Sequence, residues 1–300
     1  MATANKRVYN PVAATINGVA CGGIMTVALE EGFENIIRSS PDGLAGPAMV
    51  DREVQFCRGS LVCQDWPEAI LLLLGAVGTF VFYERKSGAA AATGYVKHTL
   101  TAPVIHAASI RFTKGSHAVV TAQFECRAAS ETATIADMHA MTDSQSAPTY
   151  VPAARGGFRI STAVFGEIDI YHVLSFSFEA SGILHKACND ADLAYTAVDV
   201  CLEAMNIGGS ISFQDSEITT AQLKSQQLLL AAADDLVLTI TQSGGAANKT
   251  LTVANAFFVG DSGNSDINSD YSEHALNYQV GNDVDAPLTL DGANKVLTIA

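Results

Sequence analysis

An alternation of apolar and polar residues predicts β-strands along most of this 300-residue chain. Residues 14–29 contain one or two such stretches around a Gly-Gly break, and residues 50–64 alternate with a period of two, which is typical of a half-buried strand. Between them, residues 31–50 contain the turn signal Ser-Ser-Pro-Asp-Gly and a Gly-Pro pair, so a long loop is expected there. The pattern indicates a mainly β fold.

Two helices are predicted directly after strands. Asp65 begins the sequence Asp-Trp-Pro-Glu, in which the aspartate can cap the N–H groups of a first helical turn and the proline has no N–H to lose. This helix is expected to end near Gly75. Asp215 or Ser216 can cap a longer helix at residues 217–233, whose leucines supply an apolar face. One flanking helix is therefore expected in each half of the chain.

The two helix starts close a repeated phrase. The sequence GSLVCQD at residues 59–65 recurs as GSISFQD at residues 209–215, at an offset of 150, which is half of the chain. The same order of elements follows each copy: a strand and a Gly/Ala turn at 78–94 and 235–249, Thr-Leu-Thr at 99–101 and 250–252, and a last strand at 116–128 and 272–283. A repeat of this kind predicts the duplication of one domain.

Length and composition suit two domains in a larger assembly. We expect one domain at residues 1–128 and another at 158–300, joined by an Ala/Ser/Thr/Pro-rich linker at 129–157 that contains a short helix around 135–141. Hydrophobic residues make up 48% of the chain and charged residues only 16%, which leaves less solvated surface than a typical monomer has. Either part of the outer surface is buried in an assembly, or the chain is simply rich in Ala, Gly, Ser and Thr.

The charge of the chain is strongly acidic and uneven. The net charge is −14; residues 1–150 carry 11 Lys and Arg against 13 Asp and Glu, and residues 151–300 carry 6 against 18. Such a chain is a poor candidate for gripping nucleic acid, because phosphate contacts need Lys and Arg. An acidic wall could still surround nucleic acid and let it slide, and the alternative is an acidic exterior that keeps the protein soluble.

Compartment signals are few. No apolar run follows the first ten residues, so no signal peptide is expected, and the longest apolar run, residues 69–83, is shorter than the roughly 20 residues of a transmembrane helix. We expect this run to contain the end of a helix and a buried strand. The six cysteines are scattered without a Cys-x-x-Cys pair, which favours reduced, buried thiols made in a cytoplasm.

No sequence pattern indicates catalysis, and no catalytic, cofactor or metal site is expected. The chain contains no His-Glu-x-x-His, no nucleophile elbow with partners and no phosphate-binding glycine loop. The histidines His98, His106 and His117 are interpreted as ordinary residues of a sheet, and Cys57 and Cys63 lack a second pair of ligands for a metal. The acidic stretch 261–270 lacks the last glutamate of a calcium loop and is interpreted as a solvated hairpin tip.

The order of elements resembles the tail tube proteins of bacteriophages. The resemblance rests on the strands, the 31–50 stretch and the strand-to-helix sequence GSLVCQDWPEAILLLLG; it covers residues 12–127 and, more weakly, 158–300. In that family, which includes type VI secretion tubes and baseplate hubs, a β-barrel-like or sandwich domain carries one helix and a long hairpin loop. The resemblance implies two tandem tube domains, with six domains in each ring, so that three duplicated chains form one ring.

The resemblance implies a structural virion protein and not an enzyme. The first hypothesis is a major tail tube subunit that forms trimers, stacks into a hollow tube with other tail proteins, and passes DNA through an acidic or neutral bore without specific binding. It would be made in the host cytoplasm, reside in the tail, and insert in no membrane. A baseplate hub or tail-tip ring of the same fold is the second hypothesis. A carbohydrate-binding or adhesin-like β protein is a third, although Trp66 is the one tryptophan that could serve it.

The expected loop at 31–50 is the candidate contact between subunits. It carries too many large apolar side chains for a free solvated loop, and these would pack on a neighbouring subunit or ring. The alternative is that they complete the core of their own domain. The residues concerned are Phe33, Ile36, Ile37 and Leu44.

Overall fold

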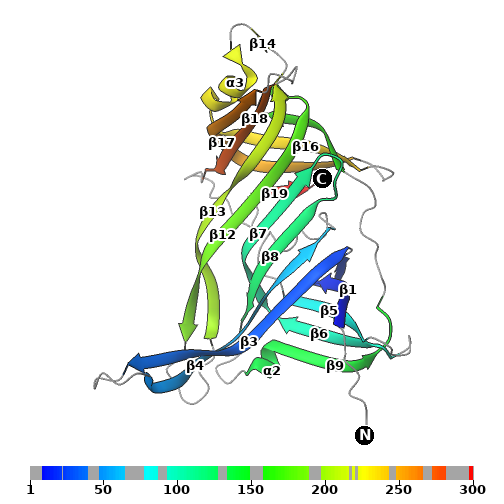
Figure 1. Ribbon diagram of the computed structural model, residues 1–300, viewed down its shortest axis with the longest axis vertical. Coiled ribbons are helices and arrows are strands. Elements are labelled where there is room, and N and C mark those ends of the chain that lie inside the picture. Colours follow the sequence, from blue (N-terminus) through cyan, green and yellow to red (C-terminus); the bar gives the residue numbers. More distant parts are fainter. Residues whose placement is uncertain are drawn as a thin grey trace.

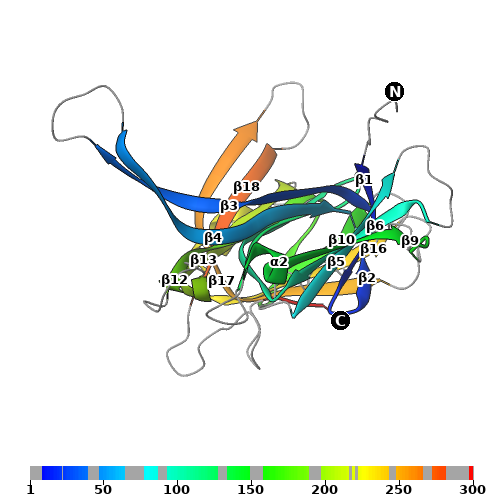
Figure 2. The same ribbon diagram turned by 90° about the horizontal axis from the view of Figure 1, so that it is seen from below.

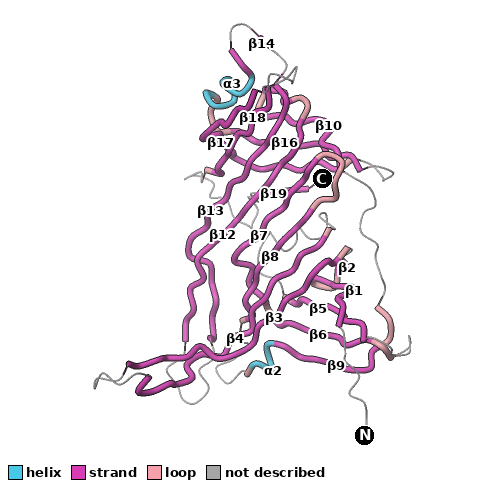
Figure 3. The backbone as a smooth tube through the Cα atoms, in the orientation of Figure 1, coloured by secondary structure: helices cyan, strands magenta, loops and turns pink. Residues whose placement is uncertain are grey.

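The computed structural model shows a mainly β protein, as the sequence predicts (Figures 1 and 3). It describes residues 9–21, 23–39, 47–64, 78–86, 93–127, 134–148, 158–188, 197–215, 218–219, 222–242, 248–265, 272–281 and 297–299. No helix within these residues is long and apolar enough to cross a membrane.

A five-stranded antiparallel sheet forms from the first half of the chain. Its order is β2-β1-β5-β6-β9, so sequence neighbours lie side by side except where β5 joins β1 and where β9 joins β6. The short helix α2 leads directly into β9. The bounds are β1 Tyr9–Ile16, β2 Val19–Cys21, β5 Thr79–Lys86, β6 Tyr95–Thr101, α2 Ile135–Met138 and β9 His139–Gln145.

A second, larger sheet runs through both halves of the chain. Its order is β11-β10-β16-β17-β18-β13-β12-β7-β8-β4-β3, with β19 also paired to β17. The first-half strands are β3 Ile24–Ser39, β4 Pro47–Cys63, β7 Pro103–Thr113 and β8 Val119–Cys126. The others are β10 Phe158–Phe165, β11 Ile168–Ile170, β12 Val173–Cys188, β13 Ala197–Asp215, β16 Asp234–Gln242, β17 Lys249–Ser265, β18 Ser272–Val280 and β19 Leu297–Ile299. In the described residues neither sheet closes into a barrel.

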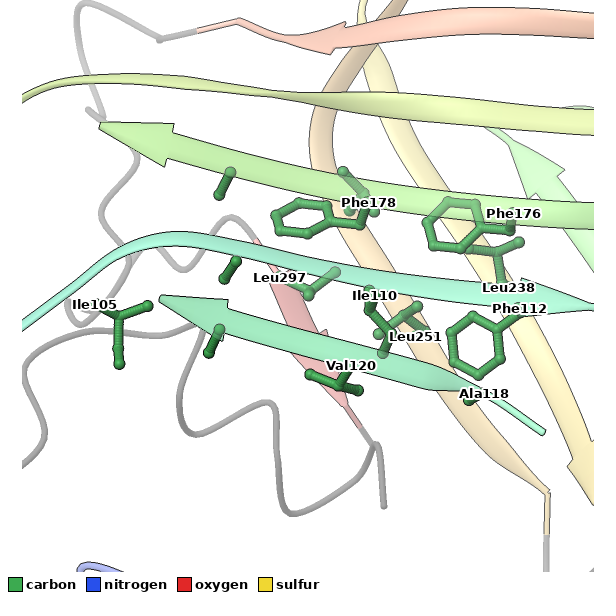
Figure 4. Packing of buried hydrophobic residues seen from close by; sticks show 14 of the residues in the cluster. Ile105, Ile110, Phe112, Ala118, Val120, Phe176, Phe178, Leu238, Leu251 and Leu297 are labelled. Carbon is green, nitrogen blue, oxygen red and sulfur yellow. The ribbon is translucent and has the colours of Figure 1, made fainter. Parts of the chain in front are cut away.

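The core lies between these layers and is rich in phenylalanine. Strands alternate buried and partly exposed residues, as in β6, because one face of each strand packs inward. Phe80 of β5 meets Phe124 of β8 edge-on at 5.5 Å, which joins the two sheets of the first half. Figure 4 shows Phe112 of β7 and Phe176 of β12 on the same side of their strands, with ring centroids 6.2 Å apart. Four cysteines, Cys21, Cys57, Cys63 and Cys126, are buried thiols of this core.

The pairing pattern of the first half recurs in the second. The hairpin β3–β4 pairs Val27 with Leu61, and β12–β13 pairs Phe176 with Ile211, at offsets of 149 and 150. The strands β7 and β8 correspond to the second part of β17 and to β18, and both pairs have a bulge at the same place, after Ile105 and after Phe258. The junction before each pair has a positive φ, 44° at Ala102 and 49° at Asn255.

The repeated phrase has a structural cause. Gly59 and Gly209 lie where a Cβ would come within 2.2 Å of the Ala28 carbonyl oxygen and 1.9 Å of the Ser177 carbonyl oxygen, respectively, so only glycine fits. The backbone N–H groups of Gln64 and Gln214 then donate to carbonyls of the partner strand, those of Gly23 and His172. The phrase is therefore the sequence of a strand that approaches its neighbour unusually closely.

The prediction that Asp215 caps a helix is wrong. Asp215 is the last residue of β13 and pairs with Ser272 of β18, so the sheet satisfies its backbone. The predicted helix at 217–233 is shorter: α3 spans Lys224–Leu230, and the preceding residues form a small hairpin, β14 (Ile218–Thr219) with β15 (Gln222–Leu223). Asp65 and the first predicted helix lie outside the described residues.

The predicted loop at 31–50 is largely a hairpin. Residues 31–39 continue β3 and residues 47–50 belong to β4, with Ile36 opposite Asp51 and Ile37 opposite Val50. Backbone pairing extends the strands past the sheet, and Figures 1 and 2 show the hairpin projecting from the rest of the molecule. The counterpart β12–β13 is equally long. The turn residues misled the sequence interpretation because they mark only the tip.

Part of the predicted linker belongs to the five-stranded sheet. The expected short helix is present as α2, but residues 139–145 form β9, which pairs with β6. Its composition, rich in small polar residues, is common to linkers and to edge strands. Similarly, residues 261–265 of the expected solvated tip are strand and pair with β18.

Candidate functional site

The larger sheet has a polar, uncovered face. Along β17, β18, β13, β12, β7, β8, β4 and β3, the side chains that alternate with the core residues point away from the second layer. Shallow hollows lie along this face. Small polar side chains dominate it, among them Ser60, Ser109, Thr121, Ser177, Ser210 and Asn277.

The charges of this face are mostly acidic. Arg58 forms a bidentate pair with Glu30 at 2.9 and 3.1 Å, and Arg111 pairs with Glu179 at 2.7 Å. The Arg58 guanidinium lowers the pKa of Glu30, with its hydrogen bond as the main cause. Glu125 of β8 and Glu273 of β18 add two carboxylates. Among the described side chains on this face of these strands there are therefore four glutamates, of which Glu125 is buried, and two arginines.

The two halves meet edge to edge at β7 and β12. These strands pair antiparallel from Ser175 opposite Thr113 to Ser181 opposite Ala107. The Lys114 N–H donates to the Leu174 carbonyl oxygen at 2.8 Å, and this bond sets the alternation of hydrogen-bonded and non-hydrogen-bonded pairs along the ladder. The sheet thus passes from one half of the chain to the other without a break.

Two long strand segments of the same sheet are paired on one side only. In the described residues β3 pairs only with β4, and residues 257–265 of β17 pair only with β18. In the recurring pattern, β3 corresponds to β12 and this part of β17 corresponds to β7. The two edges therefore correspond to the two strands that already pair at the junction inside the chain. Figure 1 shows them at opposite ends of the molecule.

Two pairs of positions show how closely the edges match the internal junction. On the uncovered face, Glu179 lies opposite Ser109 at the junction, and the corresponding edge residues are again a glutamate and a serine, Glu30 and Ser262. On the core face, Ala180 lies opposite Ala108. The corresponding edge residues there are, by contrast, two carboxylates, Glu31 and Asp261.

Each of these edge carboxylates has a histidine partner. Asp261 accepts from Nδ1 of His274 at 2.9 Å, and the His274 ring is buried beside Phe213. Glu31 pairs with Nδ1 of His139, the buried first residue of β9. The side chain of Glu31 is 35% exposed and that of Asp261 is 21% exposed, so both carboxylates lie at the border between core and solvent.

The His139 partner continues into a buried chain of polar groups. Nε2 of His139 lies 2.9 Å from Nδ1 of His98, and Nε2 of His98 lies 3.3 Å from Oε2 of Glu84. A proton must sit between the two facing ring nitrogens, because otherwise two lone pairs would meet. Burial raises the pKa of Glu84 and lowers the pKa of His98 to about 4.

Burial of His98 predicts a loss of stability in acid. Its pKa falls from 6.5 to about 4 on folding, so between these values the unfolded chain binds more protons and stability decreases as pH decreases. From pH 7 to 4.5 this residue should cost about 2 kcal/mol. In the variant His98→Phe, which keeps a ring against Phe82, the difference in unfolding free energy between these pH values should shrink by that amount; an unchanged difference in urea titrations would contradict the assignment.

The sequence-predicted contact residues are only partly described. Phe33 is 37% exposed on β3, and the backbone of Ile36 and Ile37 lies in the same strand, while Leu44 lies outside the described residues. The prediction that they contact a neighbouring subunit stays a prediction. Searching the described residues for three or more His, Cys, Asp or Glu that could hold a metal finds no group.

The histidine clusters were missed because no local pattern marks them. His98 and His139 are 41 positions apart, and Glu31 and His139 are 108 apart. Only the pairing of β9 with β6 brings these residues together.

A comparison with protein-family models and a search of curated proteins both find no match for this chain.

Proposed function

We propose that this chain is a structural ring-forming subunit, a major tail tube protein built from two tandem tube domains. The observation that carries the proposal is the β7–β12 junction, in which one half of the chain already pairs with the other through the two strands whose counterparts form the outer edges. An edge strand is a template for pairing with another chain. Copies joined as the halves are joined therefore extend one continuous sheet.

Closure of that sheet into a ring follows from the head-to-tail geometry. The two edges are different surfaces, so the contact between copies is heterologous, and repeated heterologous contacts form a ring where the rotation closes. The family resemblance implies six units in each ring, which three copies of this chain supply. A ring satisfies both of these strand edges, which leaves a soluble and finite particle.

The uncovered face is proposed to line the bore. In the described residues the two halves pair with each other through β7 and β12, whereas β2-β1-β5-β6-β9 of the first half does not pair with β11-β10-β16 of the second half. In a ring the outer layer has the larger circumference, so the layer whose halves are not paired suits the outside and the paired layer suits the inside. The bore would then present serine, threonine and asparagine with three exposed glutamates against two arginines. Such a lining offers few phosphate contacts, and DNA could pass without being held.

The partners and location follow from the same proposal. Rings stack on one another and on other tail proteins, DNA occupies the lumen without specific binding, and the protein resides in the virion tail after synthesis in the host cytoplasm. The chain serves assembly and carries out no reaction.

A disulfide between copies tests the proposal. By correspondence with Glu179 and Ser109, Glu30 of one copy should face Ser262 of the next as a non-hydrogen-bonded pair, with Cα atoms about 4.5 Å apart. The variant Glu30→Cys/Ser262→Cys should form covalent dimers and closed trimers under mild oxidation. The variant Ser109→Cys/Glu179→Cys is the matched control, because it should close within one chain. A control that closes while the edge pair yields only monomers would contradict the proposal.

Negative-stain electron microscopy separates the tube from the other reading of this fold. Long hollow tubes are expected for a major tail tube protein, and single rings that do not stack would favour a baseplate hub or tail-tip ring. The appearance of neither, together with failed cross-linking, would exclude both functions.

The hairpin tip gives a further prediction. The variant Ile36→Ser/Ile37→Ser should remain a folded monomer and assemble poorly, if the tip contacts a neighbouring subunit or ring. Sedimentation velocity and thermal melting measure the two properties separately. If these residues instead belong to the core of their own domain, the melting transition should fall, since each buried isoleucine contributes about 1.5–3 kcal/mol.

A further inference from the structure

We propose that the seam between copies sets Glu31 of one copy directly opposite Asp261 of the next, and that closing this seam takes up protons. The inference rests on the proposed ring. It specifies the register of the contact, the residues that distinguish it from the junction inside the chain, and the condition that controls it.

The register follows from the correspondence of strands. At the internal junction Phe178 pairs with Ile110 and Ala180 with Ala108. Residues of β3 correspond to those of β12 at an offset of 149, and residues of β17 correspond to those of β7 at an offset of 153. Applying these offsets to the internal pairs places Leu29 opposite Gly263 and Glu31 opposite Asp261. The bond from the Lys114 N–H to the Leu174 carbonyl makes the Phe178 and Ala180 pairs hydrogen-bonded ones, so the corresponding seam pairs are hydrogen-bonded too.

The free strands present their hydrogen-bonding groups in the same phase. The Gln64 N–H donates to the Gly23 carbonyl, which starts the β3–β4 ladder. Counting along β3 from this bond, and allowing for the bulge after Ile24, the backbone N–H and C=O groups of Leu29 and Glu31 point away from β4. The bond from the Gly281 N–H to the Asn255 carbonyl does the same for Asp261 and Gly263 with respect to β18. Both edges therefore offer donors and acceptors at the residues that the correspondence pairs.

On the core-facing side of the seam, two negatively charged carboxylates repel each other at high pH. Glu31 shares a face with buried Cys57, and Asp261 shares a face with buried Leu276. Facing side chains in a strand pair have Cβ atoms about 4.5–5.5 Å apart, and like charges there repel. The internal junction avoids the problem with two alanines. At the seam the pair can be closed most readily when a proton neutralises one carboxylate or gives a positive charge to a histidine beside it.

The groups around the pair can hold such protons. Glu31 faces His139, behind which lie His98 and Glu84, and it lies near the thiols of Cys57 and Cys126. Asp261 faces His274, and α3, which packs against β17, contributes Lys224 as its one charged residue. Both nitrogens of His139 are already engaged, so this ring offers a metal no lone pair. The arrangement favours a proton over a bridging cation.

The test measures assembly by sedimentation velocity at pH 6 and pH 8. For the wild type, each proton taken up on assembly makes the association constant fall by up to about tenfold for every unit by which the pH rises. The variant Glu31→Gln/Asp261→Asn keeps acceptors for His139 and His274 but removes both charges. It should assemble at pH 8 as the wild type does at pH 6, with no pH dependence between them.

A variant with the same change of net charge away from the seam is the control. Glu167→Gln/Asp169→Asn, at the β11 end of the sheet, should retain the wild-type pH dependence, and melting curves at pH 8 show whether each variant is folded. Equal pH dependence in the wild type and in Glu31→Gln/Asp261→Asn would overturn the inference. Loss of assembly at both pH values in EDTA would also overturn it, because a cation would then join the carboxylates.

The disulfide test distinguishes this failure from failure of the ring itself. If Glu30→Cys/Ser262→Cys closes into trimers while the carboxylate variant shows no effect, the register stands and the proton linkage is wrong. If the cysteine pair never cross-links and no assembly forms at either pH, the proposed function and the seam fall together.

Discussion

Replacing Gly209 by alanine should destabilise the monomer by at least about 3 kcal/mol, because the new methyl group has no space. Its Cβ would lie 1.9 Å from the Ser177 carbonyl oxygen and 2.6 Å from the Tyr278 hydroxyl oxygen. Tyr278 is buried and its hydroxyl donates to that same carbonyl at 2.7 Å. The methyl group must therefore separate β12 from β13 or break a buried hydrogen bond. Urea unfolding of the monomer, followed by far-UV circular dichroism, measures the loss of unfolding free energy.

Two other glycines calibrate this result. Gly59→Ala places its Cβ 2.2 Å from the Ala28 carbonyl oxygen and 2.9 Å from the Phe124 ring, so a comparable loss is expected. Gly260→Ala meets nothing within 4 Å and should change the unfolding free energy of the monomer by less than about 1 kcal/mol. If Gly209→Ala behaves like Gly260→Ala, the close approach of the two strands is not a constraint on the sequence.

The repeated phrase could be read from the sequence because its cause is local. A glycine needed for close backbone approach and a buried Leu61 or Ile211 two positions later leave a recognisable pattern. The second predicted helix start could not be read in the same way. Asp215 follows a strand and precedes a polar stretch, which suits a cap, but the neighbouring strand β18 extends far enough to pair with it. Pairing with a distant strand overrides the local preference.

The alignment of the later strands shows a second limit. Sequence similarity sets Thr-Leu-Thr at 99–101 against 250–252, which is an offset of 151, but the pairing of Phe80 with Leu100 and of Leu236 with Val253 gives 153. A shift of two residues leaves every side chain on the same face of its strand. The pattern of apolar residues therefore fits both alignments, and only the bulges and strand partners decide between them.

The candidate site depends on a relation that composition does not encode. The sequence indicated an assembly through its low fraction of charged residues, and it placed the contact at the hairpin tip because apolar residues gather there. The edges of β3 and β17 carry both polar and exposed apolar side chains, and their significance comes from backbone groups and from their correspondence with β12 and β7. Strand edges carry no side-chain signature, so their role appears only once the order of the strands is known.

Replacing Gly263 by proline should abolish assembly and leave the monomer folded. Gly263 lies on the edge of β17, and its N–H points away from β18, toward the proposed seam. Proline has no N–H, and its ring would occupy the space of the incoming strand. The loss of one donor, with the Leu29 carbonyl of the next copy left without its partner, should weaken each seam by about 2–4 kcal/mol. Sedimentation velocity should show monomers at concentrations where the wild type forms rings.

The variant Gly263→Ala is the matched control for that experiment. Both substitutions add a Cβ about 3.0 Å from the His274 ring, so both should shift this side chain and lower the monomer's melting temperature by a similar amount. Only proline removes the N–H. Assembly should therefore survive in Gly263→Ala and fail in Gly263→Pro. Normal rings from the proline variant would show that this edge is not paired between copies, whereas equal loss in both variants would assign the effect to His274 and not to the backbone of the seam.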